Sequence, residues 1–165
     1  MKNIKIFFFS CFLIFLSSQS KSETKVAFVE MNILINQSPA GKSLIEELFK
    51  IDEKNKKRFK KIKKELDKEK NDLNSKKNIL SKEEYEKNLI ELNSRFKNFQ
   101  TEIKKTAVSL QAKRNAGMQN ILKEINLLLT EYSVKNELNF IIDQKNIIIG
   151  KSELNITNKI LKLLK

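Results

Sequence analysis

Apolar residues in the middle of the chain recur at the spacing of a helix. Phe59, Leu66, Leu73 and Leu80 stand seven residues apart, among mostly charged residues. A seven-residue repeat keeps one narrow apolar stripe facing a partner helix. Further on, apolar residues follow at steps of three and four, and these are Tyr85, Leu89, Leu92, Phe96, Phe99 and Ile103. The pattern predicts two long helices that pack against each other along narrow stripes.

Two sequence signals predict where these helices begin. Ser38 followed by Pro39 is typical of a helix start, with Ser as the N-cap and Pro at the first helical position. Ser81 with Glu84 three residues later has the pattern of a capping box. We therefore expect residues 42–117 to form an antiparallel coiled-coil hairpin, the arm, whose tip lies at about residues 74–81.

Short β-branched runs flank the predicted arm. Residues 24–31, TKVAFVEM, are expected to form a strand. Leu138–Ile142 and Ile147–Ile149 lie on either side of a polar turn that begins at Asp143. These two runs predict a β-hairpin.

Residues 23–41 and 118–165 together predict a small β body at the root of the arm. Ile121–Leu129 carries apolar residues on more than one helical face, and Asn155 is expected to cap a last helix. Gly117 lies where the arm meets the body, and it is either a flexible point or a close-packing position.

These elements together predict an α+β fold that is mostly α. So small a body makes a marginal core with open strand edges, which favours a homo-oligomer that shares one sheet.

The first 22 residues have the pattern of a signal peptide. Lys2 and Lys5 precede an apolar run from Ile6 to Leu16, and small residues follow it. We expect cleavage near Ser22 and export from the cytoplasm. The only cysteine, Cys11, lies within this segment.

Positive charge is concentrated in the predicted arm. The chain has 33 Lys and Arg against 20 Asp and Glu, and residues 42–115 hold 22 of these cations and 13 of the acids. Such a surplus attracts anionic partners, although it is also found on a merely solvated helix face. Because an exported protein does not meet the chromosome, we expect no nucleic-acid partner in the cell. Candidate contact residues are Lys54, Lys56, Lys57, Arg58, Lys60, Lys61, Lys63, Lys64, Arg95, Lys97, Lys104 and Lys105.

Signatures of catalysis are missing from the sequence. The chain has no His, no Gly-rich phosphate loop, no metal-ligand spacing and no nucleophile with a base nearby. We expect a protein that is not an enzyme and needs no cofactor or metal.

The order of short motifs resembles the Skp (OmpH-like) family of periplasmic chaperones. The motifs are TKVAFVEM, SPAGK at residues 38–42, LSKEEYEK, LNFIID and the NIT that precedes the last helix. The resemblance implies a homotrimer around a shared β body, with three arms enclosing a cavity. It further implies that the cavity holds unfolded outer-membrane proteins in the periplasm without ATP. Asn155 stands where Asp is common in the family.

The resemblance also bears on partners and alternatives. Candidate residues for the shared body are Val26, Phe28, Phe140, Ile142 and Ile148. An anionic membrane surface or lipopolysaccharide stays open as a further partner, with no residues assigned. A structural coiled-coil protein of the envelope is the alternative function, and a basic nucleic-acid-binding protein is a weaker one.

Overall fold

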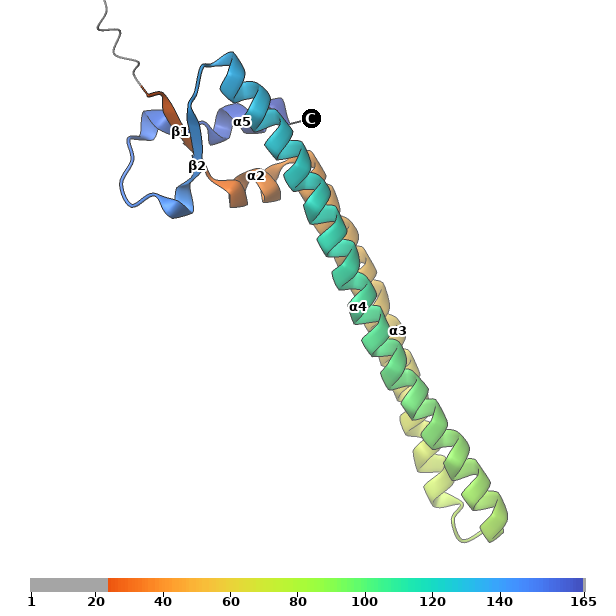
Figure 1. The fold of residues 1–165 in the computed structure, drawn as a ribbon. Helices are drawn as coiled ribbons and strands as arrows, with labels where there is room; N and C mark the ends of the chain where they lie inside the picture. The colour runs from red at the N-terminus through yellow and green to blue at the C-terminus, as the bar shows by residue number, and fades with distance from the viewer. Residues whose placement is uncertain (1–23, 165) are drawn as a thin grey trace, which may run out of the picture.

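The computed structural model describes residues 24–164, which form a small body with a long arm projecting from it (Figure 1). The arm is built from α3 (Pro39–Ser75) and α4 (Lys82–Lys135), which lie side by side as an antiparallel hairpin (Figure 1). At a rise of 1.5 Å per residue, α4 is about 80 Å long. The predicted signal peptide, with Cys11, lies outside the described residues.

A narrow seam of apolar side chains joins the two helices of the arm. Leu66 and Leu73 of α3 and Leu92 of α4 are buried between the helices. Nearer the body, Phe59 and Phe99 meet edge to face with their ring centroids 5.9 Å apart. The seven-residue stripe predicted from the sequence is therefore confirmed.

Side-chain caps begin both long helices where the sequence predicts. The Ser38 hydroxyl accepts a hydrogen bond from the Gly41 backbone N–H at 3.0 Å. At the tip, the Ser81 hydroxyl accepts from the Glu84 backbone N–H, and the Glu84 carboxylate accepts from the Ser81 N–H, each at 3.2 Å. These bonds satisfy N–H groups that have no partner within the helix.

Ser81→Ala is expected to loosen the first turn of α4 by about 1 kcal/mol, because the capping hydroxyl is lost. The tip is far from the body, so the effect should stay local. Hydrogen exchange of the Glu83, Glu84 and Tyr85 amides should accelerate about fivefold. Amides near Ile125 are the internal control, and faster exchange there would contradict a local role for the cap.

The body wraps short elements around the root of α4. It contains β1 (Val26–Val29), α2 (Met31–Gln37), β2 (Phe140–Asp143) and α5 (Thr157–Leu163), with 3₁₀ turns η1 (Gln144–Asn146) and η2 (Ser152–Leu154). Its buried core residues are Ala27, Val29, Leu34, Ile121, Ile125, Ile156, Ile160 and Leu164. The wide apolar face predicted for residues 121–129 of α4 does enter this core.

The prediction that residues 138–149 form a β-hairpin is wrong. β2 pairs in parallel with β1, with Val26 opposite Phe140 and Val29 opposite Asp143. Residues 147–149 form no strand, because η1 turns the chain away directly after β2. Asp143 is the turn residue expected, since its carboxylate accepts from the Lys145 backbone N–H at 3.3 Å.

The segment before α5 covers the other edge of β1. The Ile156 backbone N–H donates to the Phe28 carbonyl oxygen at 3.0 Å. Asn155 was expected to cap the last helix, but the N-cap residue of α5 is Ile156, one residue later, and it has no side-chain cap. The Asn155 side-chain oxygen does accept from the Thr157 N–H, the first of the helix, at 2.9 Å. Its amide also donates to the Glu30 carboxylate at 3.0 Å. Both edges of β1 are thus occupied within the chain.

Gly117 of α4 is a close-packing position. A Cβ atom there would lie 2.6 Å from Cδ1 of Leu44 on α3. The absence of a side chain lets the two helices approach where the arm leaves the body. This contact decides between the two interpretations that the sequence left open.

Candidate functional site

The twelve candidate cations of the arm fall into two groups. Five form ion pairs, and these are Lys56, Arg58, Lys61, Lys63 and Arg95. Seven have no ion-pair partner within residues 24–164, and these are Lys54, Lys57, Lys60, Lys64, Lys97, Lys104 and Lys105. The unpaired lysines leave the arm with exposed positive charge. Contact of any of the twelve with a partner stays a prediction.

Ion pairs between the helices all lie on one side of the seam. Lys113 of α4 meets Glu47 at 2.5 Å, and Arg58 of α3 meets Glu102 at 2.8 Å. A third pair joins Arg95 to Glu69. On α3, Glu47, Arg58 and Glu69 are eleven residues apart, which is about three helical turns and returns to the same face. We call this side the ion-paired flank.

Two of the candidate cations, Arg58 and Arg95, thereby have a partner on the other helix. Hydrogen bonding to Glu69 raises the pKa of the Arg95 guanidinium, and Arg58 also lies over the ring of Phe59, 4.9 Å from its centroid. Such exposed pairs contribute only a few tenths of a kcal/mol each, but together they hold the register of the hairpin.

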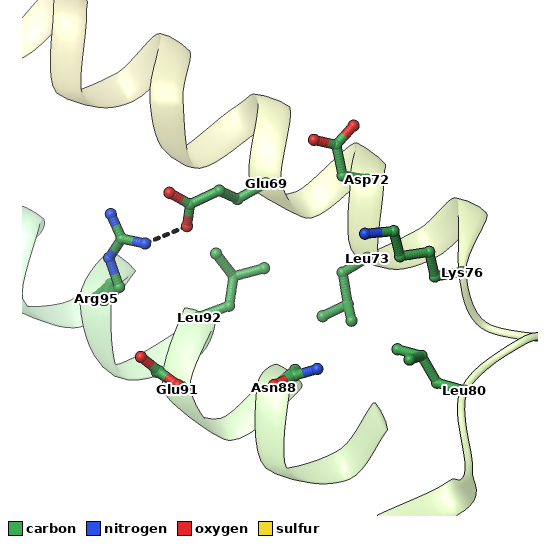
Figure 2. A pocket seen from close by; sticks show the side chains of 9 residues that line it. All are labelled: Glu69, Asp72, Leu73, Lys76, Leu80, Asn88, Glu91, Leu92 and Arg95. Carbon is green, nitrogen blue, oxygen red and sulfur yellow. Dashed lines mark hydrogen bonds and ion pairs between the residues drawn. The ribbon is translucent and has the colours of Figure 1, made fainter. Parts of the chain in front are cut away.

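A hollow of about 400 Å³ lies on the ion-paired flank near the tip (Figure 2). Figure 2 shows Leu73 and Leu92 pointing toward each other between the helices, with the Glu69–Arg95 pair beside them. Acidic and basic side chains surround the hollow in mixed order, including Asp72, Lys76 and Glu91. The lining holds three acids against two bases, so the hollow does not favour an anion.

The opposite side of the seam, the open flank, carries an apolar groove of about 650 Å³ at the root of the arm. Its apolar lining comes from Ile45, Leu48 and Phe49 of α3 and from Ala107, Leu110 and Met118 of α4. Leu48 belongs to the seam and is buried, whereas the Phe49 side chain beside it is 64% exposed. Small side chains on α4, such as Ala107, leave the groove unfilled.

Cations follow the groove toward the tip on the open flank. Phe49, Lys56, Lys63 and Lys70 stand at seven-residue intervals on α3, and Lys97, Lys104, Gln111 and Met118 do so on α4. Residues seven apart share a face, so each stripe is apolar at the root and basic beyond it. Hydrogen bonds to Asp52 and Glu53 raise the pKa of the Lys56 amine, which stays protonated at neutral pH.

The body exposes apolar residues around β2. Phe140 and Ile142 of β2 are exposed, and Ile148 and Ile149 are 99% and 91% exposed. Within residues 24–164, β1 is the only strand paired with β2, so the outer edge of β2 is open. Of the five residues predicted for a shared body, Phe28 is buried in its own chain and Val26 is half-buried. The other three, Phe140, Ile142 and Ile148, remain available.

Sequence reasoning missed the groove and the ion-paired flank. Phe49 directly follows the seam residue Leu48, so it lies off the predicted stripe, and this offset was the available signal. The interhelical ion pairs depend on the register of α3 against α4, which the stripes alone leave undetermined.

Two further features bear on chemistry. Among residues 24–164, no group of three or more Cys, Asp or Glu side chains could hold a metal ion. None of the helices described combines the length and apolar character that spanning a bilayer requires.

Comparison with known proteins places this geometry in a family. A family model described as outer membrane protein (OmpH-like) matches residues 25–164. The crystal structure of a candidate outer membrane chaperone (OmpH-like) from Caulobacter crescentus CB15 superposes with a TM-score of 0.80 at 15% identity, covering 90% of this chain and 88% of that chain. That likeness shows the fold, and no curated protein sequence matches. With the family model spanning nearly all described residues, the chain belongs to the OmpH-like outer membrane protein family.

Proposed function

We propose that this protein is a periplasmic holdase chaperone that binds unfolded outer-membrane β-barrel proteins and needs no ATP. Residues 1–22 act as its signal peptide. Three copies join through their bodies, and their arms enclose a cavity that keeps a client from aggregating. The observation that carries the proposal is a long basic arm with unpaired lysines on a body whose sheet is open at one edge.

The open sheet edge supports the trimer. β2 offers unpaired backbone groups on its outer edge, next to exposed Phe140 and Ile142. An exposed apolar edge strand is a template for pairing with another chain. Residues 147–149 are β-branched, and Ile148 and Ile149 are exposed, so we infer that this segment becomes a strand only against a neighbouring copy.

The arm supports client binding rather than catalysis. It lacks the core of an independent domain, since its buried apolar side chains form only a narrow seam, with Leu48 near the root and Leu66, Leu73 and Leu92 toward the tip. Its exposed lysines attract acidic polypeptide segments over a range of about one Debye length. Many weak contacts of this kind, shared among three arms, hold a flexible client without a folded binding pocket.

The test is an aggregation assay with purified protein. An unfolded barrel protein is diluted out of denaturant, and light scattering is followed with and without the chaperone. Suppression of scattering at about three chains per client is expected. A structural coiled-coil protein of the envelope would leave scattering unchanged, and that result would contradict the holdase function.

Phe140→Asp is expected to convert the trimer to a monomer at micromolar concentrations. The change buries a charge against a neighbouring copy at three equivalent interfaces, and it removes about 2 kcal/mol of apolar burial at each. Sedimentation velocity measures the mass directly. Ile90→Asp, at an exposed position of α4 in the arm, is the control and should remain trimeric. A monomeric wild-type protein would rule out the shared body.

A further inference from the structure

We infer that the open flank of the arm is the client-facing side, and that its root groove binds an apolar side chain of an extended, acidic client segment. The inference rests on the proposed function and deepens it, because it states which face of the hairpin holds the client. The occupant is an unfolded polypeptide in which an acidic residue follows an apolar one at a fixed distance.

The two flanks differ in what they can still bind. On the ion-paired flank, three pairs satisfy cations of both helices, and the tip hollow is lined by mixed charges. On the open flank, no ion pair between α3 and α4 occurs within residues 24–164. Its Lys56 and Lys63 pair only with acids of their own helix. The open flank therefore combines the larger apolar groove with cations that no residue of the other helix satisfies.

Charge complementarity identifies the occupant. The α4 stripe of the open flank, Lys97, Lys104, Gln111 and Met118, contains no acid, and its lysines have no ion-pair partner within residues 24–164. Arg114 stands on the groove wall and is unpaired in the same way, whereas the acid of the groove lining, Asp52, is paired with Lys56 at 2.8 Å. A basic segment, such as a second copy of this Lys-rich arm, would be repelled here. An acidic segment with an apolar residue would be attracted.

Helix geometry sets the spacing that the client needs. Phe49 at the groove and Lys56 beyond it are seven residues apart, as are Gln111 and Lys104, and this corresponds to about 10 Å along the arm. An extended chain covers that distance in about three residues. The preferred client segment therefore places an acidic side chain about three residues from a large apolar one.

Peptide binding tests the inference. The probe is a labelled 12-residue peptide of Ser, Thr and Gly with one Phe and a Glu three residues from it. A second peptide carries Lys in place of that Glu. Purified protein should bind the Phe–Glu peptide at least tenfold more tightly than the Phe–Lys peptide, and the difference should shrink as the salt concentration rises.

Two neighbouring lysines provide a matched pair of variants. Lys104 lies on the open flank, whereas Lys105 lines a hollow on the ion-paired flank beside Glu102. Lys104→Glu should weaken the Phe–Glu peptide about tenfold, and Lys105→Glu should change its affinity less than twofold. Equal effects of the two variants would overturn the assignment of the flanks.

The groove itself is tested by Phe49→Ser, with Ile90→Ser as the control at another exposed apolar position of the arm. Phe49→Ser should weaken peptide binding at least tenfold while the trimer sediments unchanged. Loss of the trimer would instead mean that a second copy occupies the groove. If the wild-type protein suppresses client aggregation but does not bind the peptide, this inference is wrong and the holdase function stands. If it does neither, the proposed function fails as well.

Discussion

Gly41→Ala is expected to destabilise the protein by about 3 kcal/mol or more, because an added Cβ has no room. Built on this backbone, it would lie 1.7 Å from the Ile35 carbonyl oxygen and 3.0 Å from the Ser38 hydroxyl oxygen. That hydroxyl donates to the same carbonyl at 3.1 Å, so the methyl group would disrupt the corner between α2 and α3. The melting temperature should fall by about 10 °C, as followed by circular dichroism.

Gly117→Ala is the matched control, because it adds the same methyl group inside a helix. Its nearest neighbours are the terminal carbons of the flexible Leu44 side chain, which can move, whereas a backbone carbonyl cannot. Alanine also favours the helix by about 1 kcal/mol over glycine, which offsets part of the crowding. A melting temperature of the Gly41 variant equal to that of this control would show that the corner tolerates a side chain.

Ile125→Ala is expected to lower the free energy of unfolding by about 2–5 kcal/mol, because it leaves a cavity in the body core. Ile125 has 0% of its surface exposed and belongs to the cluster with Leu34 and Ile160. The core is small, so few neighbouring side chains can close the cavity. Urea titration followed by circular dichroism should give a lower midpoint.

Leu127→Ala provides the comparison for that change on the same helix. The Leu127 side chain is 63% exposed, so its removal should cost less than about 0.5 kcal/mol. Similar midpoints for the two variants would mean that Ile125 does not anchor the root of α4 in the body.

Local signals made most of the helical structure predictable. The caps at Ser38 and Ser81 and the heptad stripe through Leu66 and Leu73 involve residues within one or two helical turns of each other. Interactions over so short a distance along the chain are visible in the sequence itself. The same holds for Asn155, whose side chain reaches a backbone N–H two residues away.

Strand pairing was the part that local signals misjudged. The β-branched run at residues 147–149 has the composition of a strand, and its closeness to β2 favoured a hairpin. β2 instead pairs with β1, more than one hundred residues earlier. Composition indicates that a segment favours an extended conformation, but the partner depends on which edges the assembled core leaves free.

The sequence alone determined two long capped helices, a narrow apolar seam between them and an excess of positive charge on the arm. These properties arise from residue types and from contacts a few positions apart. Only the tertiary structure decided which strand pairs with β2, why Gly41 and Gly117 lack side chains, and which flank of the arm keeps an unfilled groove and lysines without a partner on the other helix. Each of these depends on the register between segments far apart in the chain, and that register is set by packing of the whole molecule.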